Sequence, residues 1–236
     1  DFPVLNLQKF GQHFKKQKDE ELQVIYSCKN YVKLLSFKNS TSVIVYKNLK
    51  EITSLCVIQQ NPNIIAFGTV SGAVKDYDMK SKKIVRTSAK RHKTAVSALV
   101  SMGKYLVSCS SQDNLIVVYD YKQQEEIKEI QLPQPPNSKA ELPTALCLFK
   151  DAASLPSQPH KDLLLVGTSE GKVQAYDLKE EKFAQEMGSK DQKPKKSQRY
   201  TCLKAGLRVI QVVKLAQQDK ITHSHNMFAA VSESGQ

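Results

Sequence analysis

Residues 166–179, VGTSEGKVQAYDLK, contain the stretch that decides the fold. A glycine on each side of a short polar turn can indicate a phosphate-binding loop, but that loop also needs Gly-Lys followed by Ser or Thr at the start of a helix. No helical period follows this stretch. Two apolar runs joined by a turn that contains Gly or Asn are typical of a β-hairpin. We therefore interpret the stretch as a hairpin.

The chain repeats this hairpin. Three copies align without gaps and a fourth is weaker: SGAVKDYDMK at 71–80, DNLIVVYDYK at 113–122, EGKVQAYDLK at 170–179, and KNYVKLLSFK at 29–38. The turn residues Asn30, Gly72 and Asn114 are 42 residues apart, and the turns at Gly171 and Gly235 follow after 57 and 64 residues. A fixed period identifies a repeat architecture, and the longer intervals indicate insertions.

Each copy contains four predicted strands. One apolar run precedes the turn, and an alternating run follows it. A further strand comes after each hairpin (SVIVYKN, KKIVRTS, EEIKEIQ, EKFAQEM), and another opens the next copy (ITSLCVI, AVSALVS, PTALCLF). A repeated four-stranded unit of about 40 residues is typical of a β-propeller. We expect an all-β fold with about four and a half blades over residues 22–236, after an irregular lead-in or partial blade at 1–21.

Three Tyr-Asp pairs close the alternating runs, at Tyr77-Asp78, Tyr119-Asp120 and Tyr176-Asp177. At these positions the chain resembles the WD-repeat β-propeller family, in which a Trp-Asp or similar pair ends the third strand of a blade. The chain has no Trp, so its blades diverge from the family pattern. The segment IAFGTVSGAVKDYDMKSKKIV followed by HKTAVSALV is similar in style to blades of nucleolar ribosome-assembly propellers.

The resemblance also implies a buried hydrogen-bond network in the copy at 92–120. The family joins a histidine, a Ser or Thr of the second strand, the turn aspartate and the tryptophan. The corresponding residues here are His92, Ser110 or Ser111, Asp113 and Tyr119. We expect this network to be a structural brace and not a catalytic triad.

A seven-bladed ring needs about 280 residues, and the chain has 236. We therefore expect part of a longer, seven-bladed propeller, a propeller of which some pieces are missing, or a ring that a partner strand closes.

Charge and cysteine usage limit the function classes. The net charge of +12, from 35 Lys and Arg against 23 Asp and Glu, favours acidic protein, RNA or anionic lipid as a partner. No apolar run is long enough to cross a membrane, and the opening DFPVLNLQKF lacks a secretory signal pattern. The five cysteines lack metal or redox spacing and indicate buried apolar positions. We expect an intracellular protein that binds no metal or other cofactor.

Two basic loops are the candidate partner-binding sites. In WD-repeat geometry both lie on the face that carries the turns between second and third strands. The candidate residues are Lys90, Arg91, Lys93, Lys190, Lys193, Lys195, Lys196 and Arg199. They could contact RNA phosphates or an acidic peptide, or they could be solvated loops that keep a large protein soluble.

The other insertions, at 132–143 and 151–161, are rich in proline and small polar residues. Pro133, Pro135 and Pro136 favour an extended polyproline conformation, which serves as a docking ligand or, more often, as a stiff connector. The third insertion, at 188–199, contains the second basic loop.

No motif for catalysis is present, such as a G-x-S-x-G elbow, and we expect no enzyme activity and no small-molecule substrate. The sequence favours a scaffold that holds proteins, and RNA as a further candidate, in a large eukaryotic assembly such as a ribosome-biogenesis particle. We expect the nucleus or nucleolus rather than the cytoplasm. Two alternatives remain open: a peptide or degron recognition subunit, and a subunit of a cytoskeletal, ciliary or vesicle complex.

Overall fold

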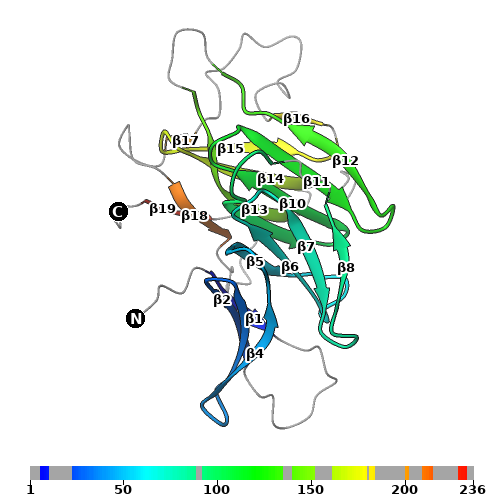
Figure 1. Cartoon of the computed structure of the whole chain (residues 1–236). Coiled ribbons are helices and arrows are strands. Elements are labelled where there is room, and N and C mark those ends of the chain that lie inside the picture. The colour runs from blue at the N-terminus through cyan, green and yellow to red at the C-terminus, as the bar shows by residue number, and fades with distance from the viewer. Residues whose placement is uncertain are drawn as a thin grey trace, which may run out of the picture. The chain divides into compact units, whose positions relative to one another are not determined.

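The computed structural model describes the chain in nine segments. They are residues 6–10, 23–88, 92–134, 140–151, 161–179, 181–183, 200–201, 209–214 and 228–232. The described residues form antiparallel β-sheets and no helix (Figure 1). The chain divides into two compact units, Asp1–Gln131 and Leu132–Gln236. The predicted all-β class and the repeated antiparallel sheets are confirmed.

The first unit contains three sheets of four strands each. The first sheet consists of β1 (Asn6–Phe10), β2 (Gln23–Cys28), β3 (Tyr31–Ser36) and β4 (Thr41–Lys47). The second sheet consists of β5 (Ile52–Val57), β6 (Ile64–Thr69), β7 (Val74–Asp78) and β8 (Lys83–Thr87). The third sheet consists of β9 (Ala98–Met102), β10 (Tyr105–Ser110), β11 (Leu115–Asp120) and β12 (Glu125–Ile130). In each sheet neighbouring strands are consecutive in the chain, so each sheet is a meander.

The second unit contains a fourth sheet and a separate hairpin. The fourth sheet consists of β13 (Pro143–Asp151), β14 (Lys161–Thr168), β15 (Lys172–Asp177) and β16 (Lys182–Phe183), and β17 (Tyr200–Thr201) also pairs with β15. The hairpin consists of β18 (Val209–Lys214) and β19 (Phe228–Ser232), and β18 lies against β13 and β14.

The turns between second and third strands have the predicted left-handed residue. The φ angle is +80° at Gly72, +48° at Asn114 and +74° at Gly171. In the first sheet the left-handed residue is Lys29 (φ +52°) and not the predicted Asn30. Cys28 pairs with Tyr31 there, so the turn has only two residues, and its first residue takes the positive φ.

The Tyr-Asp pairs have a local structural reason. The carboxylates of Asp78, Asp120 and Asp177 each accept a hydrogen bond from the backbone N–H two residues later, at 2.9, 2.7 and 2.9 Å. The fourth residue after each aspartate has a positive φ: Lys82, Gln124 and Glu181. The N–H of Lys80 holds the pKa of Asp78 below its ordinary value. The repeated aspartate therefore fixes the turn that leads into the fourth strand.

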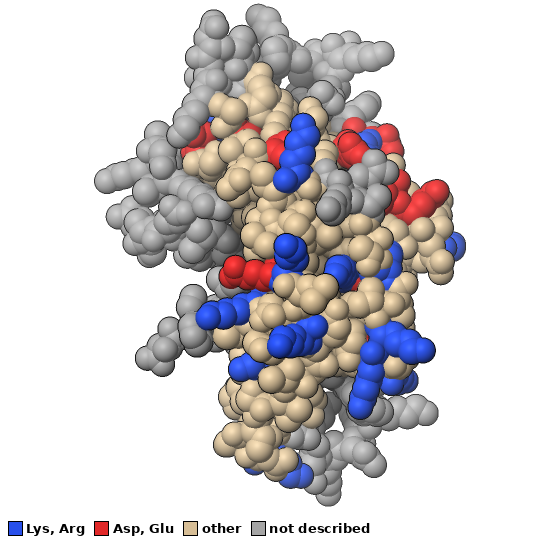
Figure 2. Space-filling view, in the orientation of Figure 1, with Lys and Arg blue, Asp and Glu red and all other residues tan. Residues whose placement is uncertain are grey.

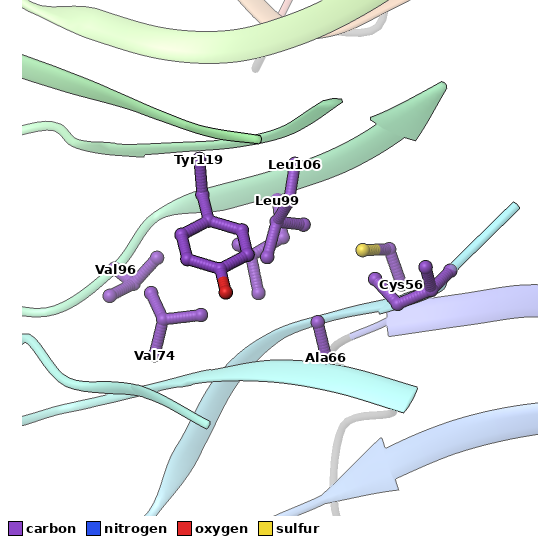
Figure 3. Packing of buried hydrophobic residues seen from close by; sticks show 8 residues of the cluster. Cys56, Ala66, Val74, Val96, Leu99, Leu106 and Tyr119 are labelled. Atoms are coloured by element: carbon purple, nitrogen blue, oxygen red, sulfur yellow. The ribbon is translucent and has the colours of Figure 1, made fainter. Parts of the chain in front are cut away.

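The core of the first unit lies between its sheets. Ile25 and Val32 of the first sheet pack against a group in the second sheet: Ile52, Leu55, Ile65, Phe67 and Tyr77. Between the second and third sheets the buried residues are Cys56, Ile58, Ala66, Val74, Val96, Leu99, Leu106 and Tyr119, most of them shown in Figure 3. Tyr77 and Tyr119 thus lie on third strands and pack against the preceding sheet.

Tyr176 of the second unit is also buried, on the third strand of the fourth sheet. The four described cysteines form no disulfide, and burial raises the pKa of the Cys56 thiol. None of the described residues belongs to a helix long and apolar enough to cross a membrane.

Candidate interaction surface

The first and second sheets carry most of the positive charge of the first unit. Residues 23–88 contain ten Lys or Arg and three Asp or Glu, whereas residues 92–131 contain four Lys and five Asp or Glu. In Figure 2 most of the charged side chains visible over β4, β7 and β8 are Lys or Arg, and a group of Asp and Glu lies near the β12 end of the third sheet. The excess of positive charge in the first unit therefore lies on its first two sheets and not on the third.

Two of the three carboxylates in residues 23–88 are used within the fold. Asp76 is 1% exposed and is paired with Arg86. Asp78 accepts hydrogen bonds from the N–H of Lys80 and the hydroxyl of Ser81 within its turn. Seven lysines of the same range are exposed: Lys29, Lys38, Lys47, Lys50, Lys80, Lys82 and Lys83. The outer surface of these two sheets is consequently more cationic than their composition indicates.

Asp76 and Arg86 belong to a polar cluster between the second and third sheets. The Arg86 Nε and Nη2 atoms donate to the two carboxylate oxygens of Asp76 at 2.6 and 2.9 Å. Tyr121, in the turn directly after β11, donates its hydroxyl to Asp76 Oδ2 at 2.7 Å. The Arg86 guanidinium also lies 4.0 Å from the centroid of the Tyr119 ring. The cluster therefore joins the two sheets through directional contacts.

The protonation state of this cluster is fixed near neutral pH. Burial lowers the pKa of Arg86, but Asp76 raises it more, and the net shift is upward. Burial raises the pKa of Tyr121, and the Asp76 charge raises it further. A guanidinium and a phenol that both keep their protons do not transfer one at neutral pH, so the arrangement suits a structural clamp and not acid–base chemistry.

The cluster was missed in the sequence analysis. In the repeat, Asp76 occupies the place of the buried residue Val118 of β11. A carboxylate at a buried position of an alternating run, with an arginine on the next strand, was the available signal.

In the structure His92 has a different hydrogen-bond partner from the one that the family resemblance implied. His92 is 2% exposed, and its Nε2 atom lies 2.9 Å from Ser108 Oγ, within hydrogen-bonding distance. Its Nδ1 atom lies 3.6 Å from Asp113 Oδ2, which is too long for a hydrogen bond. Asp113 instead accepts from the backbone N–H groups of Lys93 and Leu115 at 2.8 and 3.2 Å. Burial lowers the pKa of His92 despite the opposing Asp113 charge, so the ring is neutral at pH 7.

The structure places Ser108, and not the predicted Ser110 or Ser111, beside His92. Ser110 lies 2.5 Å from the hydroxyl of Thr94, and Ser111 lies in the turn after β10. Ser108 and Ser110 share one face of the strand because side chains alternate with period two, so the strand pattern alone does not choose between them. Tyr119 packs in the apolar cluster beneath Arg86.

Most of the predicted partner-binding residues lie outside the described residues. These are Lys90, Arg91, Lys190, Lys193, Lys195, Lys196 and Arg199. Lys93 is described and exposed, and its backbone N–H is bound to Asp113. The assignment of these loops to a binding face stays a prediction. The predicted loop insertions at 132–143, 151–161 and 188–199 are described only at 132–134, 140–143, 151 and 161.

A second buried carboxylate lies in the second unit. Glu141 is 1% exposed, is paired with the ammonium of Lys172, and accepts a hydrogen bond from Gln174 Nε2 at 2.8 Å. Within the described part of the chain, no three His, Cys, Asp or Glu side chains are grouped to hold a metal ion.

The comparisons with known proteins concern the fold alone. No family model matches the sequence, and no curated protein matches it either. Among solved structures, the chain is similar to the computationally designed protein Ika8, with a TM-score of 0.59 and 17% sequence identity. The match covers 98% of this chain and 56% of the designed chain, so this chain spans little more than half of that protein's length.

Proposed function

We propose that the protein is a non-catalytic scaffold whose first two sheets bind an acidic partner within a multisubunit assembly. The proposal includes the finer fold assignment: the sheets are divergent WD-type blades of a propeller ring that is larger than the described sheets. The repeated turn aspartates and the face-to-face packing of successive sheets support this assignment.

One observation supports an acidic partner. The carboxylates of residues 23–88 are mostly consumed by a buried ion pair and by a turn, whereas seven lysines are exposed. A surface on which exposed lysines outnumber carboxylates attracts acidic protein segments and nucleic acid and raises their association rates. A nuclear ribonucleoprotein assembly, such as a ribosome-biogenesis particle, would provide both kinds of partner.

Charge reversal at one turn tests the proposal. Lys80→Glu with Lys82→Glu changes the β7–β8 turn, where both lysines are exposed. The matched control is Lys122→Glu with Lys179→Glu, because both lysines occupy the place of Lys80 in later copies. We expect the first variant to lose partners in affinity purification followed by mass spectrometry, and the control to keep them.

Salt dependence separates the two partner classes. Binding of a structured RNA should weaken steeply with salt, by a slope of about 0.9 per phosphate contact in a log–log plot. Each reversed lysine that contacts a phosphate should reduce this slope by about one. Equal partner recovery with both variants would contradict the proposed surface, and loss of partners only after reversal of Lys90, Arg91 and Lys93 would move the binding site to the predicted loop face.

A further inference from the structure

Strand β4 is an exposed edge. It ends the first sheet, and among the strands that the structure describes it pairs with β3 alone. All four residues from Thr41 to Ile44 are exposed, including Val43 at 59% and Ile44 at 56%. Neighbouring residues of a strand point to opposite faces, so this half of β4 is uncovered on both. In Figure 1 the β3–β4 hairpin projects beyond β5.

This edge lacks the charges that protect the other two fourth strands of the unit. Residues 41–46, TSVIVY, contain no charged residue, glycine or proline. By contrast, β8 has the sequence KIVRT, and β12 has the sequence EEIKEI. Soluble proteins place charges on exposed edge strands because an uncharged, β-branched edge recruits other strands. The contrast indicates that β4 has an occupant.

The free part of the edge is its first half. In the second half, Tyr77 donates its hydroxyl to the Val45 carbonyl oxygen at 3.1 Å. The Tyr46 ring lies 4.7 Å from the Tyr77 ring, centroid to centroid. The second sheet therefore holds Val45 and Tyr46, and an added strand would pair with the residues from Thr41 to Ile44.

The charges around β4 favour one kind of added strand over another. Lys38 lies in the turn before β4, Lys47 ends the strand, and Lys33 on β3 is paired with Ile44. An antiparallel second copy would bring Lys38 of one chain near Lys47 of the other, and like charges opposite one another disfavour strand pairing. A strand that carries carboxylates removes this repulsion.

We propose that β4 is the docking strand for an extended segment of a partner protein that alternates apolar and acidic residues and adds to the first sheet. Main-chain hydrogen bonds would supply affinity, and Val43, Ile44 and the flanking lysines would supply specificity. This inference rests on the proposed function in one respect, the acidic character of the partner.

A binding assay with a labelled peptide of sequence VEVEVEVE tests the proposal. Val43→Lys with Ile44→Lys should weaken binding about tenfold, because it removes apolar pairs and places charges on the edge. The control is Val85→Lys on β8, where Val85 is 53% exposed. The control should bind the peptide at least as tightly as the parent protein.

The direction of the effect is diagnostic. Added lysines strengthen a general attraction to an acidic peptide, so equal or tighter binding by the Val43 and Ile44 variant would overturn strand docking. Amide hydrogen exchange gives a second readout, since the peptide should slow exchange over residues 41–44 in the parent. Protection elsewhere would also overturn the proposal.

Two further measurements separate the alternatives. A parent protein that dimerises in sedimentation experiments, and that becomes monomeric in the Val43 and Ile44 variant, would make a second copy the occupant and contradict the proposal. If the Lys80 and Lys82 reversal removes cellular partners while the β4 variant keeps both partners and peptide, the proposed function stands and strand docking fails. If only the β4 variant loses them, strand docking stands without the wider cationic surface.

Discussion

The two sheet junctions of the first unit are built differently. Between the first and second sheets the contact is apolar and aromatic, centred on Ile25, Phe67 and Tyr77. Between the second and third sheets an apolar cluster is joined by the buried Asp76–Arg86 pair. The same repeat therefore tolerates two kinds of junction, because strands and turns are local features and contacts between sheets are not.

The ion pair between the second and third sheets fixes the orientation of the two sheets more than it stabilises the fold. Replacing a buried ion pair by apolar residues often leaves stability unchanged or raises it, whereas removing one partner leaves an unpaired buried charge. Arg86 is held by two hydrogen bonds and by the Tyr119 ring, and Tyr121 binds the same carboxylate from the turn directly after β11. We infer that these directional contacts fix how the second and third sheets meet.

The largest expected effect is at the apolar junction. Phe67 is fully buried, and Phe67→Ala should lower the free energy of unfolding by about 3–5 kcal/mol through lost burial and a cavity. Phe37 is 53% exposed, so Phe37→Ala should change it by less than about 0.5 kcal/mol. Urea denaturation measures both. Equal effects of the two variants would show that the first and second sheets do not pack through Phe67.

Removal of one ion-pair partner should come next. Asp76→Ala leaves the Arg86 guanidinium buried without its carboxylate and should lower the free energy of unfolding by about 3 kcal/mol. The double variant Asp76→Val with Arg86→Met gives the second sheet the apolar residue that the third sheet has at Val118, and should recover most of the loss. A double variant as unstable as the single one would mean that the charged pair itself stabilises the junction.

The His92 site should show a moderate effect. His92→Ala leaves the buried Ser108 hydroxyl without its partner and should lower the free energy of unfolding by about 1–3 kcal/mol. Ser110→Ala and Ser108→Ala separate the observed network from the sequence expectation. In double-mutant cycles with His92→Ala, Ser108→Ala should show coupling and Ser110→Ala, whose hydroxyl meets that of Thr94, should not; coupling to Ser110 alone would favour the predicted arrangement.

The His92 site should also respond to pH. The pKa of His92 in the folded protein is below its ordinary value of 6.5, so the unfolded chain binds more protons in the interval between the two values. The contribution of neutral His92 to stability is thus complete above pH 6.5 and is lost as pH falls through the folded-state pKa. Denaturation curves between about pH 7.5 and about pH 5 should show this loss, and His92→Gln should reduce it. An identical pH slope in parent and variant would contradict the assignment.

The smallest expected change in stability concerns the junction between the second and third sheets. Tyr121→Phe removes one hydroxyl from Asp76 but leaves the Arg86 pair intact, and should cost about 1 kcal/mol. Tyr26→Phe is the control, since its hydroxyl bonds to the exposed Ser42. It should cost less than Tyr121→Phe in the same denaturation experiment, and the reverse order would show that the clamp contributes little.

The sequence by itself determined the strands, the turns and their order, because these depend on residues close together in the chain. The alternation of apolar residues predicted the strands. A Gly or Asn predicted three of the four left-handed turn positions, and Lys29 is the exception. The Tyr-Asp repeat predicted third strands, and the turn that follows each aspartate is closed by that side chain through a backbone N–H two residues away.

Only the tertiary structure decided which side chains meet across the sheets. Ser108 and Ser110 lie on the same face of β10, yet His92 Nε2 meets Ser108, and the hydroxyl of Ser110 meets that of Thr94. Asp76 meets Tyr121 across 45 positions of the chain, and no local pattern encodes that distance. The exposure of Val43 and Ile44 likewise depends on where the second sheet stops covering β4, because burial is a property of the whole surface and not of the strand sequence.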